Sequence, residues 1–150
     1  MKKFKFRLQR VLEYRHQLTK EKERLLALRN AELREAEDTL QMILSEQDRS
    51  TGFEEGILSM AELSLMGDYQ QALQSALVKQ RLLVLQATDA VDEAREAYRE
   101  KAIEEESLEK LRERKVDEFK EERRKNERKE LDSLVVQRHR FTKHDAGSGE

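Results

Sequence analysis

The sequence predicts an all-α fold, an elongated antiparallel two-helix coiled coil. Three observations carry this prediction. The chain has 150 residues with no proline and only five glycines, so few positions interrupt a helix. Charged residues make up 41% of it and aromatic residues only 5%, which is a composition typical of long helices rather than of a globular core. The apolar residues recur at three- and four-residue spacing, as in amphipathic helices.

The first expected helix covers residues 4–47. Val11, Leu18 and Leu25 repeat at seven residues, and Leu33 begins a second seven-residue series. The two series are one residue out of phase. The apolar stripe therefore drifts round the helix, and we expect irregular supercoiling.

A connector is expected at residues 50–67, which hold three of the five glycines. Thr51 with Glu54 and Ser59 with Glu62 have the spacing of a capping box, in which a hydroxyl and a carboxylate satisfy the first backbone N–H groups of a helix. The second pair predicts a short helix within the connector.

Gly67 is expected to end that short helix, and Asp68 is expected to cap the next one at once. The second long helix then covers residues 68–140. Alanines on its apolar stripe would let a partner helix approach closely. The predicted stripe is Leu73, Ala76, Leu77, Leu83, Val84, Ala87, Ala90, Val91, Ala94, Ala97 and Tyr98.

The two stripes must bury each other, because an isolated amphipathic helix gains little stability in water. Matching the helix ends at the connector places residue i opposite residue 117 minus i. At a rise of about 1.5 Å per residue the helices would be about 65 and 110 Å long, so the second should overhang the first at 104–130. Residues 1–143 are expected to form this single hairpin, and 144–150 a disordered tail.

No constellation in the sequence carries catalytic chemistry. Cysteine is absent, the three histidines have no ligand spacing, and the glycines form no phosphate-binding loop. The carboxylates have no pocket that would shift their pKa values in a two-helix rod. We therefore expect no enzyme activity, no metal and no cofactor.

The basic chain ends indicate a binding role. Residues 1–10 carry five basic and no acidic residues, and residues 137–144 are also basic. In a hairpin both ends meet, so Phe4, Phe6 and Arg7 would join the 131–141 region in a basic tip suited to docking on a protein. Nucleic-acid binding is a weaker alternative, because the basic runs are short and no recognition fold is present.

Several stretches resemble the FliJ-type flagellar export proteins. Phe4-Lys5-Phe6-Arg7-Leu8-Gln9-Arg10-Val11-Leu12, followed by Arg15, is similar to the opening F-x-F-R-L-Q-x-V-L-x-x-R of that family. The stretches at 108–115, 127–134 and 68–71 also resemble it. Ser133 departs from the family pattern, which often has an acidic residue there, and the connector shows no clear match.

The resemblance implies a noncatalytic, soluble cytoplasmic component of the flagellar type III export apparatus, peripheral to the inner membrane at the flagellar base. No apolar run approaches the ~20 residues of a membrane span, which agrees with this. Family members resemble the central stalk of rotary ATPases. The implied partners are the hexameric export ATPase ring, the cytoplasmic domain of the export gate and export chaperones, and the free protein is expected to be a monomer.

Candidate contact residues follow from the matched positions. Those expected on the ATPase side are Phe4, Phe6, Arg7, Leu8, Gln9, Leu12, Arg15, Glu127, Glu130, Leu131 and Asp132. Those expected at the export gate are Tyr69, Gln70, Leu73 and Gln80.

Two alternatives remain open at this point. One is the corresponding stalk protein of a virulence type III secretion system, which shares the architecture. The other is a generic self-associating coiled-coil scaffold, in which the same stripes pair between chains. The molar mass in solution separates the monomeric hairpin from the scaffold.

Overall fold

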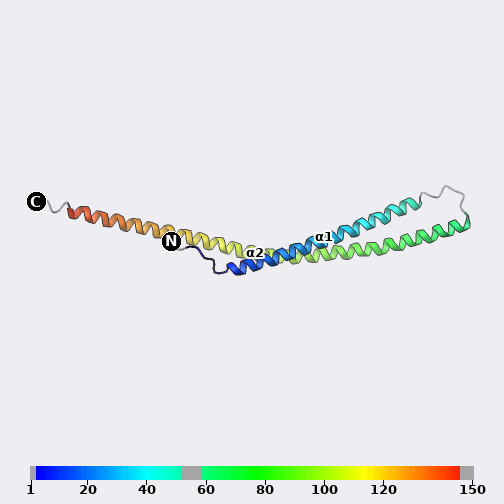
Figure 1. Cartoon of the computed structure of the whole chain (residues 1–150), viewed down its shortest axis with the longest axis horizontal. Helices are drawn as coiled ribbons and strands as arrows, with labels where there is room; N and C mark the ends of the chain where they lie inside the picture. The colour runs from blue at the N-terminus through cyan, green and yellow to red at the C-terminus, as the bar shows by residue number, and fades with distance from the viewer. Residues whose placement is uncertain (1–2, 52–58, 146–150) are drawn as a thin grey trace. The chain divides into compact units, whose positions relative to one another are not determined.

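The structure is a computed structural model, and it describes residues 3–51 and 59–145. In this part of the chain, α1 covers Gln9–Thr51 and α2 covers Met60–Asp145 (Figure 1). The residues form two units. Arg15–Glu104 is the hairpin unit, and Met1–Tyr14 with Glu105–Glu150 is the strap unit.

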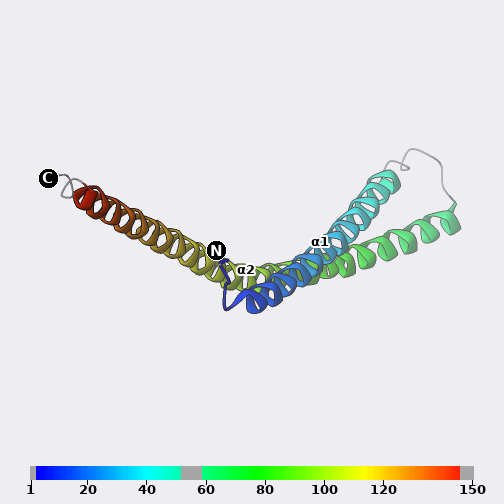
Figure 2. The same cartoon turned by 60° about the vertical axis from the view of Figure 1, so that its left-hand side comes forward.

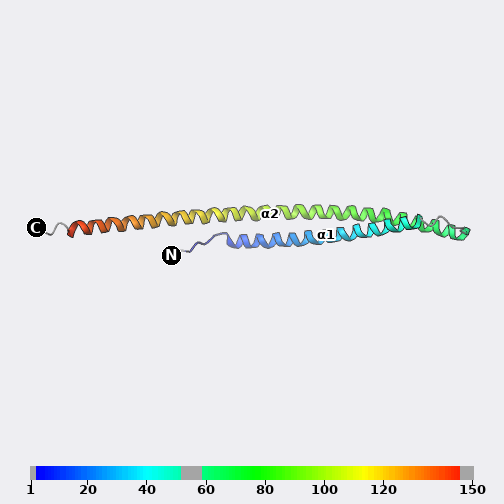
Figure 3. The same cartoon turned by 90° about the horizontal axis from the view of Figure 1, so that it is seen from above.

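In the hairpin unit α1 and α2 run antiparallel, side by side in Figure 3 and crossing in the view of Figure 2. Two hydrogen bonds fix their register: Thr19 Oγ1 donates to Lys101 O at 3.3 Å, and Gln80 Nε2 donates to Ala36 O at 2.9 Å. The predicted register places positions 98 and 81 opposite Thr19 and Ala36, within three residues of the observed partners. The predicted antiparallel hairpin is confirmed.

The seam of the hairpin unit follows the predicted stripe on α2. Leu77, Val91 and Ala94 are buried, with 4%, 3% and 6% of their surface exposed. Leu83 is a wrong prediction, because it is 51% exposed. It lies about 100° round the helix from its neighbour Val84, which occupies the seam. The half-buried members of the stripe are Leu73, Ala76, Val84, Ala87, Ala90, Ala97 and Tyr98.

The prediction that helix one begins at residue 4 is wrong, since α1 begins at Gln9. Residues 3–8, which we call the strap, alternate basic and apolar side chains in the two-residue period of an extended segment. Their burial alternates in the same way: the three apolar residues are half-buried and the three basic ones are exposed. Gln9 N donates to Phe6 O at 3.1 Å, which turns the strap into the helix.

The start of α2 confirms one capping box and contradicts the predicted break after it. Ser59 N donates to Glu62 Oε2 at 2.7 Å, and Glu62 N donates to Ser59 Oγ at 3.3 Å. The hydrogen bond from the Ser59 backbone, with a second from its hydroxyl, lowers the pKa of Glu62 below its ordinary value. From this cap α2 begins at Met60 rather than at 68.

Gly67 therefore lies inside α2, and the expected short helix and second long helix are one helix. The residue adopts no positive φ, and a Cβ added there would meet no atom within 4 Å. A glycine inside a helix costs about 1 kcal/mol relative to alanine. That cost is smaller than the loss of the backbone hydrogen bonds that a break would remove, so the helix continues through Asp68.

The other element ends also extend beyond the predicted limits. Thr51 is the last residue of α1, and its hydroxyl donates to Asp48 O at 2.8 Å. Its expected capping partner, Glu54, lies outside the described residues, as do residues 52–58 of the predicted connector. At the other end α2 reaches Asp145, so the predicted tail at 144–150 begins inside the helix and its remainder, 146–150, lies outside the described residues.

Candidate docking site

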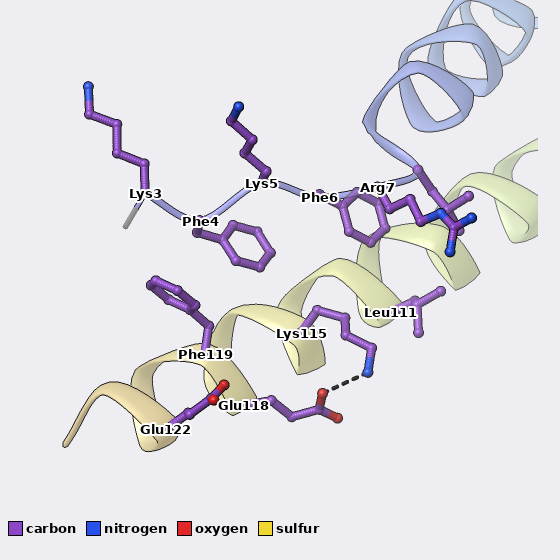
Figure 4. A pocket seen from close by; sticks show the side chains of 11 residues that line it. Lys3, Phe4, Lys5, Phe6, Arg7, Leu111, Lys115, Glu118, Phe119 and Glu122 are labelled. Carbon is purple, nitrogen blue, oxygen red and sulfur yellow. Dashed lines mark hydrogen bonds and ion pairs between the residues drawn. The ribbon is translucent and has the colours of Figure 1, made fainter. Parts of the chain in front are cut away.

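The strap lies along one face of α2 in the strap unit (Figure 4). The rings of Phe4 and Phe119 face each other, with centroids 5.6 Å apart and planes tilted by 56°. Leu111, Lys115 and Phe119 recur at four-residue spacing, which places them on one stripe of the helix. The apolar side of the strap is thus half-buried against the stripe of α2 at residues 111–119.

Two shallow grooves flank this contact. The larger has a volume of about 1000 Å³ and the smaller about 600 Å³. The larger is lined by Lys3, Phe4, Lys5, Phe6, Arg7, Leu8, Leu111, Lys115, Glu118, Phe119 and Glu122. The smaller adds Gln9, Arg10, Glu13 and Arg112 to strap residues. Both grooves thus combine exposed aromatic edges with basic side chains.

The exposed side of the strap is positively charged. Lys3, Lys5 and Arg7 are exposed, and Figure 4 shows the two lysines pointing away from α2. Lys3 and Lys5 lie in the extended part of the strap, where alternate residues are about 6.6 Å apart, and Arg7 follows in the turn that leads into α1. The three cations form a row along the strap. On the helix below, Lys115 Nζ pairs with Glu118 Oε2 at 2.7 Å, so these two charges offset each other.

The structure brings together only some of the residues expected on the ATPase side. Phe4, Phe6, Arg7 and Leu8 all line the larger groove. The next expected residue, Gln9, donates a hydrogen bond from Nε2 to Glu13 Oε1 at 3.2 Å along α1. These five positions form one continuous surface.

Two further expected contacts are occupied within the fold. Leu12 is only 8% exposed and so belongs to the core of the strap unit. Its neighbour Val11 was expected on the apolar stripe because of its seven-residue repeat, but it is 42% exposed. The buried face of α1 at this point contains Leu12 instead. Arg15 forms an ion pair with Glu104 inside the hairpin unit.

The C-terminal candidates lie farther along α2. Arg123 Nε donates to Glu127 Oε1 at 2.9 Å, and Glu130 and Asp132 are exposed. Leu131 is 61% exposed. It follows Phe119 by twelve residues, about 18 Å of helix, so the strap does not reach it.

The residues expected at the export gate divide between internal contacts and the surface. Gln80 Nε2 donates to Ala36 O, and Leu73 is half-buried in the seam. The hydroxyl of Tyr69 donates to Glu46 Oε1 at 2.7 Å, and this hydrogen bond raises the pKa of Tyr69 above its ordinary value. Gln70 is exposed.

Leu111, Lys115 and Phe119 line the larger groove but were not among the predicted site residues. Their four-residue repeat was visible, and so was the strict alternation of residues 3–8. Residues 4–8 were predicted to be helical, and a helix would not place Phe4, Phe6 and Leu8 on one side. The packing of the alternating residues 3–8 on the stripe at 111–119 was therefore not predicted.

Within residues 3–51 and 59–145, no three histidine, cysteine or acidic side chains are placed to hold a metal ion. No helix in the same described ranges is both long and apolar enough to cross a membrane. The site can bind by charge and by apolar contact.

A comparison of sequences decides the family. The profile of the family described as Flagellar FliJ protein matches residues 4–143, nearly the whole chain. This chain belongs to the FliJ family. The resemblance seen in the opening motif is therefore confirmed, and the FliJ-family chain is a noncatalytic component of the flagellar export apparatus.

Other comparisons add less. No curated protein sequence matches this FliJ-family chain. Among solved structures, a protein described as a YscO homolog, CT670 of Chlamydia trachomatis, is 22% identical with a TM-score of 0.49. The match covers 95% of this chain and 99% of the other.

Proposed function

We propose that this FliJ-family protein docks its strap unit into the hexameric export ATPase ring and promotes the assembly and activity of that ring. The observation that supports this most is the row of Lys3, Lys5 and Arg7, held on the outside of the strap by the packing of Phe4 on Phe119. Such a row steers an encounter with an acidic surface, and arginine and aromatic residues supply affinity on contact.

The C-terminal part of α2 offers a second contact with the ring. Residues 120–143 are all exposed, and their apolar side chains repeat at helical spacing. Leu131, Leu134 and Phe141 are 61%, 59% and 76% exposed. With Glu127, Glu130 and Asp132 they would form an amphipathic face for a ring subunit to cover.

Further partners follow from the same role. The proposed export-gate contact lies at the connector end of the hairpin unit and uses Gln70 and the exposed part of Tyr69, with Leu73 and Gln80 positioning that surface from the seam. Export chaperones are the other proposed partners. The protein would act in the cytoplasm at the flagellar base, peripheral to the inner membrane through these partners, with residues 1–143 serving as one functional domain.

The test is ATP hydrolysis and ring assembly by the cognate export ATPase with and without this protein. A triple variant, Lys3→Glu with Lys5→Glu and Arg7→Glu, reverses the outward charges of the strap while keeping Phe4 and Phe6. The matched control reverses three exposed cations of the hairpin unit: Lys20→Glu, Arg24→Glu and Arg34→Glu.

We expect the wild type and the control to stimulate the ATPase and the strap variant to lose that stimulation. The effect should weaken with salt, because exposed charges are screened. Equal stimulation of the ATPase by the strap variant and the control would show that the contact does not depend on the charges of the strap. No stimulation by a well-folded wild type at any protein or salt concentration would remove the proposed role.

A further inference from the structure

A second apolar stripe lies on α2 outside the hairpin seam. Val78, Leu82 and Leu85 are 60%, 55% and 58% exposed. Their spacing of four and three residues places them on one face of the helix, about 100 to 120° round from the seam residues Leu77 and Val84. Three large apolar side chains at this spacing repeat the pattern by which a helix packs on another helix.

The surroundings of this stripe are unusual in charge. From Tyr69 to Thr88 the sequence contains no acidic residue, although 41% of the whole chain is charged. The only charged residues in that stretch are Lys79 and Arg81. Lys79 follows Val78 and Arg81 precedes Leu82, so on a helix they border the stripe on opposite sides. Both are exposed.

We propose that Val78, Leu82 and Leu85 form a docking surface for an amphipathic helix of a partner protein, with acidic residues on both borders of its apolar face. In coiled-coil terms, Leu82 occupies a core position and the two cations occupy the bordering positions that select a partner by charge. A partner with glutamate at its own bordering positions would bury the stripe and pair with both cations.

A second copy of this chain fits the surface less well. In a symmetric antiparallel pair centred on Leu82, Arg81 would face Arg81 of the second copy, which is repulsive, and Lys79 would lie opposite Gln86, with no charge attraction. A parallel pair would place each cation opposite a glutamine, Gln74 or Gln86, with no charge attraction. None of the four residues proposed for the export gate belongs to this surface. Substitutions can therefore test the two contacts separately.

The experiment measures binding of two designed peptides to the full-length protein by fluorescence anisotropy. Both peptides carry leucines at heptad core positions; one has glutamate and the other lysine at the bordering positions. We expect the glutamate peptide to bind at least about tenfold more tightly than the lysine peptide. The double variant Leu82→Gln with Leu85→Gln should lose this binding, and Lys79→Glu with Arg81→Glu should reverse the preference.

The matched control is Met42→Gln with Leu63→Gln, which removes two exposed apolar side chains away from the stripe. Glutamine is a good helix former, and circular dichroism checks that each variant keeps its helix. Equal binding of both peptides, or binding that survives the stripe variant, would overturn the proposal. Self-association of the wild type in sedimentation that the stripe variant removes would also overturn it, because the occupant would then be a second copy.

Discussion

Residues 60–104 and 120–143 belong to the same helix, yet their side chains are buried to very different extents. In the first segment, Leu77, Val91 and Ala94 are at most 6% exposed. In the second, every residue is exposed, and Leu131 and Val135 reach 61% and 67%. Both segments have apolar residues at helical spacing, so the sequence pattern alone does not distinguish a buried seam from an open surface.

The difference teaches what keeps each segment helical. In the hairpin unit the packing of α1 against α2 stabilises the helix, because most helical stability in proteins comes from a buried amphipathic face. In residues 120–143 local interactions take this role, such as the pair of Arg123 with Glu127 at 2.9 Å. A pair of that kind contributes about 0.2 to 0.5 kcal/mol. The apolar residues of this segment are consequently available to a partner.

The strongest test of the comparison is to truncate one leucine in each segment. Leu77→Ala should lower the free energy of unfolding by about 2 to 4 kcal/mol, because it leaves a cavity in the seam. Leu134→Ala, at a position that is 59% exposed, should change it by less than about 0.5 kcal/mol. Denaturant unfolding followed by circular dichroism measures both. Equal losses would show that the C-terminal segment is covered in solution.

A second test enlarges a small side chain in the seam. Ala94→Leu should destabilise the hairpin unit by about 1 to 3 kcal/mol, because the buried alanine leaves no room for a larger side chain. Ala31→Leu, at an exposed position of α1, is the control and should be nearly neutral. A neutral Ala94→Leu variant in the same unfolding experiment would mean that the two helices are less closely packed there than described.

A third test concerns the strap, which stands between the two extremes. Phe119→Ala removes the partner ring of Phe4, a contact of about 0.5 to 1.5 kcal/mol beyond area burial. Hydrogen exchange of the Gln9 amide, which donates to Phe6 O in the strap, should accelerate, while the seam residues keep their protection. Phe141→Ala, at a position that is 76% exposed, should leave the strap unchanged. Unchanged exchange in the Phe119→Ala protein would show that the strap is not held by this contact.

The smallest expected effect lies at the start of α2, where a capping box acts without burial. Ser59→Ala should cost about 1 kcal/mol of local helix stability. Because the pKa of Glu62 is lowered in the folded state, its stabilising effect is present above the ordinary value and disappears as pH falls through the lowered value. The protection factor of the Leu63 amide, which corrects for the intrinsic pH dependence of exchange, should therefore fall at acid pH, and Glu62→Gln should weaken that fall. An unchanged profile in the Glu62→Gln protein would contradict the capping role.

Much of the fold could be predicted from local signals. The absence of proline and the helical spacing of apolar residues predicted two long antiparallel helices, and the Ser59–Glu62 pair predicted a helix start that the hydrogen bonds confirm. The prediction failed at Gly67, where glycine was taken as a break although a helix tolerates it at modest cost. It also failed at residues 4–8, where a two-residue alternation was treated as helix.

The sequence by itself determined the helical architecture, the register to within a few residues and, through its opening motif, the family. Only the tertiary structure decided which apolar residues are used inside the protein and which remain exposed. Leu83 and Leu77 have equal hydrophobicity, yet one is 51% exposed and the other 4%. The physical reason is that the burial of a side chain depends on the surface that packs against it. That surface is formed by residues distant in the chain, as in the packing of Phe4 on Phe119.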